Sequence, residues 1–461
     1  MPTTLCGVNS TFNDTIAAMA TAPGPAGIAI VRLSGPQSLA IADRLVHCSG
    51  APPSARPGGT FLYGMLSDGG RELDEAVVLI FRAPHSYTRD DVVEIQGHGG
   101  QAAAGRILQA VLAAGARLAE PGEFTRRAFL NGRIDLVQAE AVADLIRARS
   151  DRAAAAALEQ LEGHLSEALN GLYDHLMAAV ADLEASLDFE EGELPATVID
   201  AIADRLGAVE QEIETLIAGW EEGHLLREGA RVVIAGQPNV GKSTLMNRLL
   251  GKERSIVTHL PGTTRDTIEE SLIIGGIPIR LTDTAGLRDS SCIVEQEGVT
   301  RATDSILQAD LVLYLFDASL PVTAIDRSNL GALNPQKTLL IQNKSDLLDS
   351  PPTSPDPAFE TLLCSAIEAT GIDHIRQSLL ARLGHVDTAP HAVISERHRA
   401  LLVQAHRLIA EARQIAAQDE SFLVPAADAL RSALEQLGTI TGRTYTDELL
   451  DAIFSRFCIG K

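Results

Sequence analysis

A glycine-rich turn in the middle of the chain has the residue types that hold the phosphates of a nucleotide. Residues 236–243 read Gly-Gln-Pro-Asn-Val-Gly-Lys-Ser, between the apolar run 232–234 and a helix-like stretch at 244–250. Glycines let backbone N–H groups close around phosphates, and a helix N-terminus adds partial positive charge. Lys242 would reach the β- and γ-phosphates, and the Ser243 hydroxyl would ligate Mg²⁺. The alternative is a chance glycine turn, but the length of the pattern and its strand-to-helix setting favour a phosphate loop.

Further along the chain, a second motif selects the base. Residues 343–346 read Asn-Lys-Ser-Asp and follow an apolar strand-like run. The Asp346 carboxylate can accept two N–H bonds from the edge of guanine, whereas adenine would leave it unpaired. The backbone of Ser365 and Ala366, after another strand-like run, would cap the guanine carbonyl. The four-residue motif alone could be a surface turn, but this order of elements predicts GTP.

Two polar segments between these motifs carry candidate magnesium ligands. Residues 261–266 read Pro-Gly-Thr-Thr-Arg-Asp, and Thr264 would be the second hydroxyl ligand. A strand at 279–282 runs into Asp-Thr-Ala-Gly, where Asp283 can hold a water on Mg²⁺ and the Gly286 N–H can meet the γ-phosphate.

Two positions depart from the Ras-like pattern. Leu287 stands where a glutamine would orient the attacking water, so another group must do so. We expect Glu295 to do this; Arg288 and Asp289 are rivals, and Glu295 could be merely a surface carboxylate. The Asn239 carbonyl oxygen could ligate a K⁺, whose charge would replace that of an arginine finger.

The amino-terminal part reads as mixed α/β. Strands are expected at 28–33, 76–81 and 92–95, and a helix at 101–118. The Gln-Gly-His-Gly-Gly turn at 96–100 lies where a strand feeds a helix, a common place for a ligand. The alternative is a tight connector with a surface histidine.

Helical patterning surrounds the nucleotide module. Apolar residues spaced by three and four predict one long helix with a bundle-core stripe: Leu158, Leu161, Leu165, Leu169, Leu172, Leu176, Val180, Leu183 and Leu187. An acidic run at 188–193 is expected to be a solvated turn; the alternative, a metal site, has no partner histidine at ligand spacing. Helical patterning returns at 395–417, 426–437 and 444–457 after a linker at 384–391. One bundle with the nucleotide module inserted is the expected arrangement.

Composition narrows the class of protein. The 461 residues carry a net charge of −23, which disfavours non-specific nucleic-acid binding, so an RNA partner would need a local basic patch or a second protein. No apolar run approaches a membrane span, and no signal peptide is expected at the start. The cysteines are scattered without a paired motif, which favours a reducing cytoplasm: Cys6, Cys48, Cys292, Cys364 and Cys458.

Motifs at both ends are more specific than those of the nucleotide module. They are Asn-Asp-Thr-Ile-Ala at 13–17, the turn at 96–100, Pro-Gly-Glu-Phe-Thr-Arg-Arg-Ala-Phe-Leu-Asn-Gly at 121–132 and Phe-Cys-Ile-Gly-Lys at 457–461. With these motifs the chain resembles the MnmE (TrmE) family of tRNA-modification GTPases over essentially its whole length.

The resemblance implies a multidomain fold. It comprises an α/β tetrahydrofolate-binding-like and dimerisation domain at 1–134, a discontinuous α-helical bundle at 135–228 and 385–461, and an inserted Ras-like P-loop G domain at 229–384.

The resemblance also implies a function. The chain would be a potassium-activated GTPase and a homodimer acting in the cytoplasm with the flavoprotein MnmG, as a heterotetramer. Together they would install an aminomethyl or carboxymethylaminomethyl group at C5 of the wobble uridine of certain tRNAs, with 5-formyl- or methylene-tetrahydrofolate as the one-carbon source. The alternative is a GTPase switch or ribosome-assembly factor without nucleoside chemistry.

The resemblance also implies site residues, at the positions of this sequence that match the motifs of the family. The potassium ligands would be Asn239, Thr258, Leu260 (by its carbonyl) and Thr263. The magnesium ligands would be Ser243 and Thr264, and Glu295 would position water. Folate contacts would be Arg32, Glu94, Arg133 and Lys461, although the family often has lysine at the position of Arg133. Cys458 is a candidate for a chemical role, against a packing role. Further nucleotide contacts would be Val240, Gly241, Lys242, Thr244, Asp283, Thr284, Ala285, Gly286, Asn343, Lys344, Asp346, Ser365 and Ala366.

Overall fold

The computed structural model describes residues 13–186, 196–251, 269–283, 304–350, 352, 354–383, 394–416 and 423–461. The chain forms two compact units. The first takes Met1–Ala143, Leu161–Leu206 and Arg407–Lys461, and the second takes Asp144–Gln160 and Gly207–His406. Among the described residues, no helix combines the length and the apolar content needed to cross a bilayer.

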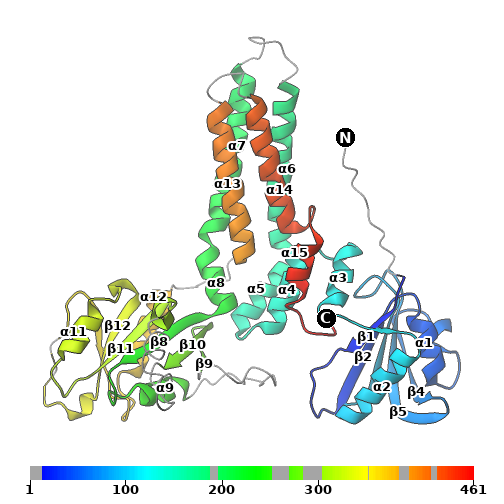
Figure 1. Ribbon diagram of the computed structural model, residues 1–461, viewed down its shortest axis with the longest axis horizontal. Coiled ribbons are helices and arrows are strands. Elements are labelled where there is room, and N and C mark those ends of the chain that lie inside the picture. The colour runs from blue at the N-terminus through cyan, green and yellow to red at the C-terminus, as the bar shows by residue number, and fades with distance from the viewer. Residues whose placement is uncertain are drawn as a thin grey trace, which may run out of the picture. The chain divides into compact units, whose positions relative to one another are not determined.

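The first unit begins with a seven-stranded sheet of order β3-β4-β5-β6-β2-β1-β7. Its strands are β1 Ile16–Met19, β2 Ile28–Ser34, β3 Val46–His47, β4 Thr60–Asp68, β5 Arg71–Phe81, β6 Val92–His98 and β7 Arg117–Leu118. Helices α1 (Ser38–Leu45) and α2 (Gln101–Ala113) pack on one face (Figure 1). Alternation along β2 places Val31 and Leu33 in the core beneath these helices and puts Arg32 on the other face.

Two sequence predictions about this sheet need correction. The helix expected to reach residue 118 ends at Ala113, because Gly115 takes φ +115° and the chain then pairs with β1 as β7. The segment 96–100 is not wholly a turn, since β6 continues through His98 before α2 begins.

Helices complete the first unit. They are α3 Glu123–Leu130, the first part of α4 (Leu136–Arg147), α6 His164–Ser186, α14 Leu423–Thr441 and α15 Asp447–Phe454. α6 precedes the nucleotide module and α14 follows it, yet the two pack against each other. The prediction that one long helix carries the apolar stripe from Leu158 onward is wrong. Gly163 takes φ +103° and separates α5 (Asp151–Glu162), which holds Leu158, from α6.

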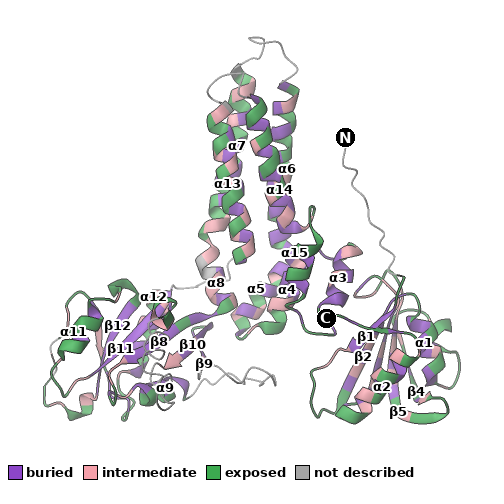
Figure 2. Ribbon diagram, in the orientation of Figure 1, coloured by how far each residue is buried: buried purple, intermediate pink, exposed green. Residues whose placement is uncertain are grey.

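The second unit holds a six-stranded sheet of order β13-β12-β11-β8-β10-β9. Its strands are β8 Ala230–Gly236, β9 Glu269–Ile274, β10 Ile277–Asp283, β11 Leu311–Asp317, β12 Thr338–Asn343 and β13 Glu360–Leu363. All neighbouring pairs are parallel except β9 with β10. The core clusters on its two faces include residues of α9 (Lys242–Leu250) and α12 (Ile372–Leu383) on one side and of α11 (Ala324–Leu330) on the other. The central strands are therefore almost wholly buried (Figure 2).

Three further helices lie before or after this sheet in the sequence. α7 spans Ala196–Ala218, α8 spans Trp220–Glu228 and α13 spans Glu396–Ala416. Within the second unit, His406 of α13 and Glu214 of α7 form a pair at 3.0 Å between Nε2 and Oε1.

Candidate nucleotide and one-carbon sites

The phosphate loop connects β8 to α9 and needs glycine at both ends. Gly236 takes φ +142°, and a Cβ there would lie 2.5 Å from the Leu315 carbonyl oxygen. Gly241 takes φ +99° as the residue before α9, and a Cβ there would lie 2.3 Å from Asn343 Nδ2. Because an L side chain would be strained and would also clash at either position, these glycines fix the path of the loop.

Lys242 lies under the loop rather than in solvent. Its ammonium donates to the carbonyl oxygens of Gly236 at 3.0 Å and Gln237 at 2.8 Å, and its side chain is buried. These contacts hold the cation against the turn that the sequence assigns to the phosphates.

Two groups that the sequence assigns to Mg²⁺ lie together. The Ser243 hydroxyl donates to Asp283 Oδ2 at 2.9 Å, from the start of α9 to the end of β10. A hydroxyl and a carboxylate are oxygen ligands of the kind that a hard divalent cation takes. Thr244, the next residue of α9, is exposed.

Asn343 ties the phosphate loop to the loop after β13. Its Nδ2 donates to the Val240 carbonyl oxygen at 2.8 Å, and its Oδ1 accepts from the Ala366 N–H at 2.9 Å. The Asn343 side chain is almost fully buried. The neighbouring Cys364 thiol is also buried, and this raises its pKa to about 12. The asparagine of the sequence motif thus connects two loops that are over a hundred residues apart in sequence.

Lys344 and Asp346 extend toward the same edge of the sheet. Lys344 takes φ +66°, and its ammonium donates to Asp317 Oδ2 at 2.6 Å. Burial opposes ionisation of Asp317, but the bonds from Lys344 and Ser319 outweigh it and lower the pKa of that carboxyl. Asp346 accepts a hydrogen bond from the Ser365 hydroxyl.

The two N–H groups expected to cap guanine already have acceptors. Ser365 N donates to the Thr370 carbonyl oxygen at 3.1 Å, and Ala366 N donates to Asn343. A guanine carbonyl at this place would have to share the Ala366 N–H with Asn343.

Sequence reasoning missed three contributors to this site. Asp317 is one, although it ends a buried strand directly beside Asn343 in the register, a position where polar residues of parallel sheets gather. Asp326 is another: it is buried and accepts from Gln237 Nε2 at 2.9 Å and from the Tyr314 hydroxyl at 3.0 Å. Arg248, the third, contacts the loop after β13. The spacing Thr323-x-x-Asp326 is a local signal for Asp326, since these two residues form the capping box of α11. No local pattern marks Arg248.

Several predicted nucleotide-site residues lie outside the described residues. They are Thr258, Leu260, Thr263, Thr264, Thr284, Ala285, Gly286, Leu287, Arg288, Asp289 and Glu295. The acidic run at 188–193 also lies outside the described residues. The remaining potassium candidate, Asn239, is exposed on the phosphate loop with φ +66°.

In the first unit, Arg32 and Glu94 form the centre of a second candidate site. They are directly paired across β2 and β6, and Arg32 Nε donates to Glu94 Oε1 at 2.8 Å. Both side chains are mostly buried, at 16% and 14% exposed. They lie on the sheet face opposite α1 and α2.

Aromatic rings hold two arginines at this site. The Arg32 guanidinium lies 5.5 Å from the Tyr87 ring centroid and 5.7 Å from that of Phe124. Arg133 lies 4.7 Å from the same Tyr87 ring and donates to the Tyr87 carbonyl oxygen at 3.1 Å. Burial raises the pKa of the Tyr87 hydroxyl, which is hydrogen-bonded to Thr125.

The carboxy-terminal tail closes this cluster. Arg32 Nη1 donates to the Gly460 carbonyl oxygen at 3.4 Å, and Gly122 N donates to the Cys458 carbonyl oxygen at 3.4 Å. Burial and the charge of Arg32 lower the pKa of Lys461, while Glu94 acts in the opposite direction. The Cys458 side chain is exposed. The structure therefore brings the four predicted folate residues into one cluster.

The glycine-dense motif after β6 presents an oriented histidine. His98 Nδ1 lies 2.7 Å from Asp74 Oδ1, and the His98 N–H donates to Asp74 Oδ2 at 2.8 Å. The hydrogen bond to Asp74 raises the pKa of His98, which remains 65% exposed.

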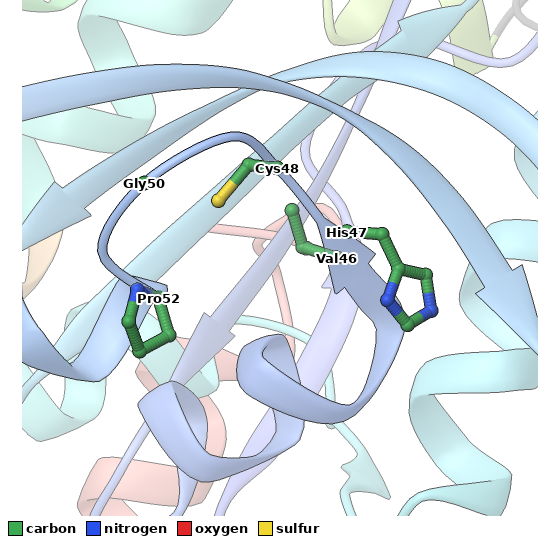
Figure 3. Close-up of a pocket in the computed structure, with 5 residues that line it drawn as sticks. All are labelled: Val46, His47, Cys48, Gly50 and Pro52. Atoms are coloured by element: carbon green, nitrogen blue, oxygen red, sulfur yellow. The ribbon is translucent and has the colours of Figure 1, made fainter.

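A separate cavity of about 390 Å³ lies beside β3 and is lined by Val46, His47, Cys48, Gly50 and Pro52. Figure 3 shows the His47 ring and the Cys48 thiol on different sides of the backbone. They do not form a thiolate–imidazolium pair, so this cavity offers no nucleophile activated in that way.

Comparisons with known proteins show the family of this chain. Residues 15–133 match the family model for the GTP-binding protein TrmE N-terminus, and residues 136–458 match that for the MnmE helical domain. The tRNA modification GTPase MnmE of Geobacter sulfurreducens is 45% identical over 461 residues, covering 97% of this chain and 99% of that protein. That of Chloroflexus aurantiacus is 46% identical over 463 residues, covering 98% and 100%.

Among solved structures, the G domain of the T. maritima FeoB iron transporter matches 34% of this chain and 99% of that chain at 24% identity, with a TM-score of 0.26. The family assignment rests on the full-length relatives and the two family models, which together cover both ends and the middle of the chain. They confirm the prediction of a GTP-hydrolysing enzyme of tRNA modification and its multidomain fold. The chain belongs to the MnmE family of tRNA modification GTPases.

Proposed function

We propose that this chain is a potassium-activated GTPase that works with the flavoprotein MnmG on the wobble uridine, position 34, of certain tRNAs. The product carries an aminomethyl or carboxymethylaminomethyl group at C5, and a folate supplies the one-carbon unit. The observation that carries the proposal is the meeting of Arg32, Glu94 and the Gly460 carbonyl in a chain that also holds a complete phosphate loop.

The Arg32–Glu94 cluster fits a reduced folate chemically. The pterin ring of a folate presents adjacent N–H donors, which a mostly buried carboxylate such as Glu94 can accept. The glutamate tail of a folate carries carboxylates, and Arg133 and Lys461 supply cations at the same cluster. 5-Formyl- or methylene-tetrahydrofolate would supply the one-carbon unit, and the exposed Cys458 beside Lys461 is the candidate for a chemical role there.

The GTP site fits Mg²⁺. Ser243 and Asp283 would hold the ion or its water, as their 2.9 Å contact supports, and Thr264 would add a second hydroxyl. When bound, Mg²⁺ neutralises charge on the β- and γ-phosphates. Lys242, whose ammonium lies against the loop, would meet the same phosphates.

For hydrolysis we propose K⁺ beside the phosphates and Glu295 as the group that positions water. Asn239 contributes the side-chain oxygen from the phosphate loop, and its positive φ of +66° is consistent with a constrained functional position. Thr258, Leu260 and Thr263 would complete the ligand set. This arrangement is motivated by Leu287, which cannot orient water as a glutamine does.

A homodimer is supported by the sheet face that carries Arg32. Ile28, Phe61 and Tyr63 lie on that face at 59%, 71% and 61% exposed. Apolar side chains of this size gathered on one face are typical of a surface that another protein covers. A second copy of the chain would cover it, and MnmG would complete a heterotetramer in a reducing cytoplasm.

The alternative is a GTPase switch or ribosome-assembly factor without nucleoside chemistry. Mass spectrometry of wobble nucleosides from cells lacking this chain separates the two. The proposal predicts that C5-modified uridine at position 34 is lost and returns with the wild-type chain but not with Glu94→Gln. Unchanged nucleosides in the deletion strain would favour the alternative.

A further inference from the structure

Arg248 connects the helix that follows the phosphate loop to the loop that follows β13. It lies in the last turn of α9. Its Nε donates to the Ala366 carbonyl oxygen at 2.8 Å, and its Nη2 donates to the Ile367 carbonyl oxygen at 2.6 Å. A planar guanidinium is suited to two carbonyls that lie side by side, because its donors have a fixed fork geometry.

An arginine at this place could simply complement the dipole of α9, but its partners argue otherwise. The two acceptors belong to a segment 118 and 119 residues further along the chain, not to α9 itself. A different residue serves the end of the helix: Arg376 of α12 donates through Nη2 to the Leu249 carbonyl oxygen at 3.0 Å. Arg248 therefore holds the loop after β13 and does not cap α9.

That loop is anchored by the buried Ala366 and by several polar contacts. The Ser365 hydroxyl accepts from the Glu368 N–H at 3.2 Å and donates to Asp346. Ile367 is 66% exposed, so apolar packing does little to fix it. The Asn343 bond to the Ala366 N–H and the Arg248 bonds to the carbonyls clamp opposite edges of the same peptide segment.

A displacement of this loop would also move Asp346, the carboxylate proposed to bind the guanine base. Asp346 is oriented by Ser365, and Ser365 precedes the first residue that Arg248 holds. Arg248 is thus coupled to Asp346 through Ser365, the residue that precedes Ala366.

We propose that Arg248 is a positioning residue that sets guanine-nucleotide affinity by holding residues 365–367 against the phosphate helix. This inference rests on the proposed role of Asp346 and the Ser365–Ala366 backbone in binding guanine. Arg248 does not touch the nucleotide in this account, so the chemical step of hydrolysis does not depend on it.

The test compares Arg248→Ala with Arg376→Ala, which removes a similar arginine–carbonyl bond at the end of the same helix without touching the loop. Stopped-flow release of a fluorescent GDP analogue and steady-state GTP turnover are measured for both. We expect Arg248→Ala to release GDP about tenfold faster and to raise KM similarly, with kcat nearly unchanged. Arg248→Lys, which keeps the charge but offers no fork, should fall between wild type and alanine.

The inference is overturned if both alanine variants change GDP release equally, since that would indicate a general effect on α9, or if Arg248→Ala leaves release unchanged. The Asp346→Asn variant distinguishes a failure of the role of Arg248 from a failure of the proposed guanine-binding role of Asp346. If Asp346→Asn weakens guanine binding and Arg248→Ala does not, only the role of Arg248 fails. If neither variant affects it, the assignment of the base site fails as well.

Discussion

Arg32 and Gly460 are 428 positions apart in sequence, yet Arg32 Nη1 donates to the Gly460 carbonyl oxygen at 3.4 Å. The contact joins a strand at the start of the chain to its penultimate residue. It makes the carboxy-terminal tail part of the cluster around Glu94, so the proposed folate site requires both ends of the chain.

Gly460→Ala tests this relationship. Gly460 takes φ +97°, and an added Cβ would lie 2.1 Å from the Met19 carbonyl oxygen, so the tail must move. We expect affinity for 5-formyltetrahydrofolate to fall by at least about tenfold, as strain of this kind amounts to roughly 1–3 kcal/mol. Gly105→Ala, in the open middle of α2, is the matched control and should bind normally. Equal folate affinity in both variants, by calorimetry, would contradict the account.

Asp346→Asn should weaken guanine recognition. The amide presents one oxygen instead of a carboxylate, so the pair of N–H donors on guanine loses a charged acceptor. The preference for GTP over ATP in competition binding should fall by roughly ten- to hundredfold. Asp349→Asn, a nearby exposed carboxylate with no assigned role, serves as the control. An unaltered preference in Asp346→Asn would count against the base-reading role.

Turnover of GTP should rise severalfold or more when K⁺ replaces Na⁺ at equal ionic strength. The reason is that the proposal assigns Asn239 as a ligand of a monovalent cation, and Leu287 cannot hydrogen-bond to the attacking water. Asn239→Ala should remove most of the difference between the two salts while GDP still binds. Equal rates in K⁺ and Na⁺ for the wild-type chain would refute the cation role.

Stability of the first unit should decline in acid. Burial opposes ionisation of Glu123, but hydrogen bonds from Arg117, Glu120 N and Arg127 outweigh it and lower its pKa below 4.5. A lowered folded-state pKa gives stability that is complete above the unfolded pKa and is lost as pH falls through the folded value. Calorimetric unfolding between pH 7 and pH 3 should show this loss.

Glu123→Gln is the variant that isolates this effect. It should reduce stability at pH 7 by roughly 1–3 kcal/mol, because the buried Arg127 loses one charged partner, and it should flatten the decline toward acid. Glu120→Gln changes a nearby exposed carboxyl and should keep the wild-type pH profile. The same acid sensitivity in Glu123→Gln and wild type would contradict the assignment.

The nucleotide elements were predictable because each is local. Phosphate-loop glycines, Lys242, Ser243 and the motif ending at Asp346 follow strands at short spacing, and the structure places them around one edge of a parallel sheet. Asp317 and Arg248 were not found, since their partners Lys344 and Ala366 come from other elements and only the fold brings them together.

Helix ends were less predictable for a related reason. Alanine-rich periodicity continues through Gly115 and the leucine spacing continues through Gly163, but positive φ at each glycine ends a helix that the pattern alone extends. The folate cluster came only from family resemblance, because no local spacing relates Arg32 to Gly460.

The most direct test of the central claim is nucleoside analysis of tRNA rebuilt in vitro with this chain, the flavoprotein partner, folate and GTP. The account predicts C5-modified uridine at position 34 with the wild-type chain, and little or none with Glu94→Gln or Asp346→Asn, although Glu94→Gln should still hydrolyse GTP. Full modification by Glu94→Gln, or by the wild-type chain without added folate, would contradict the account.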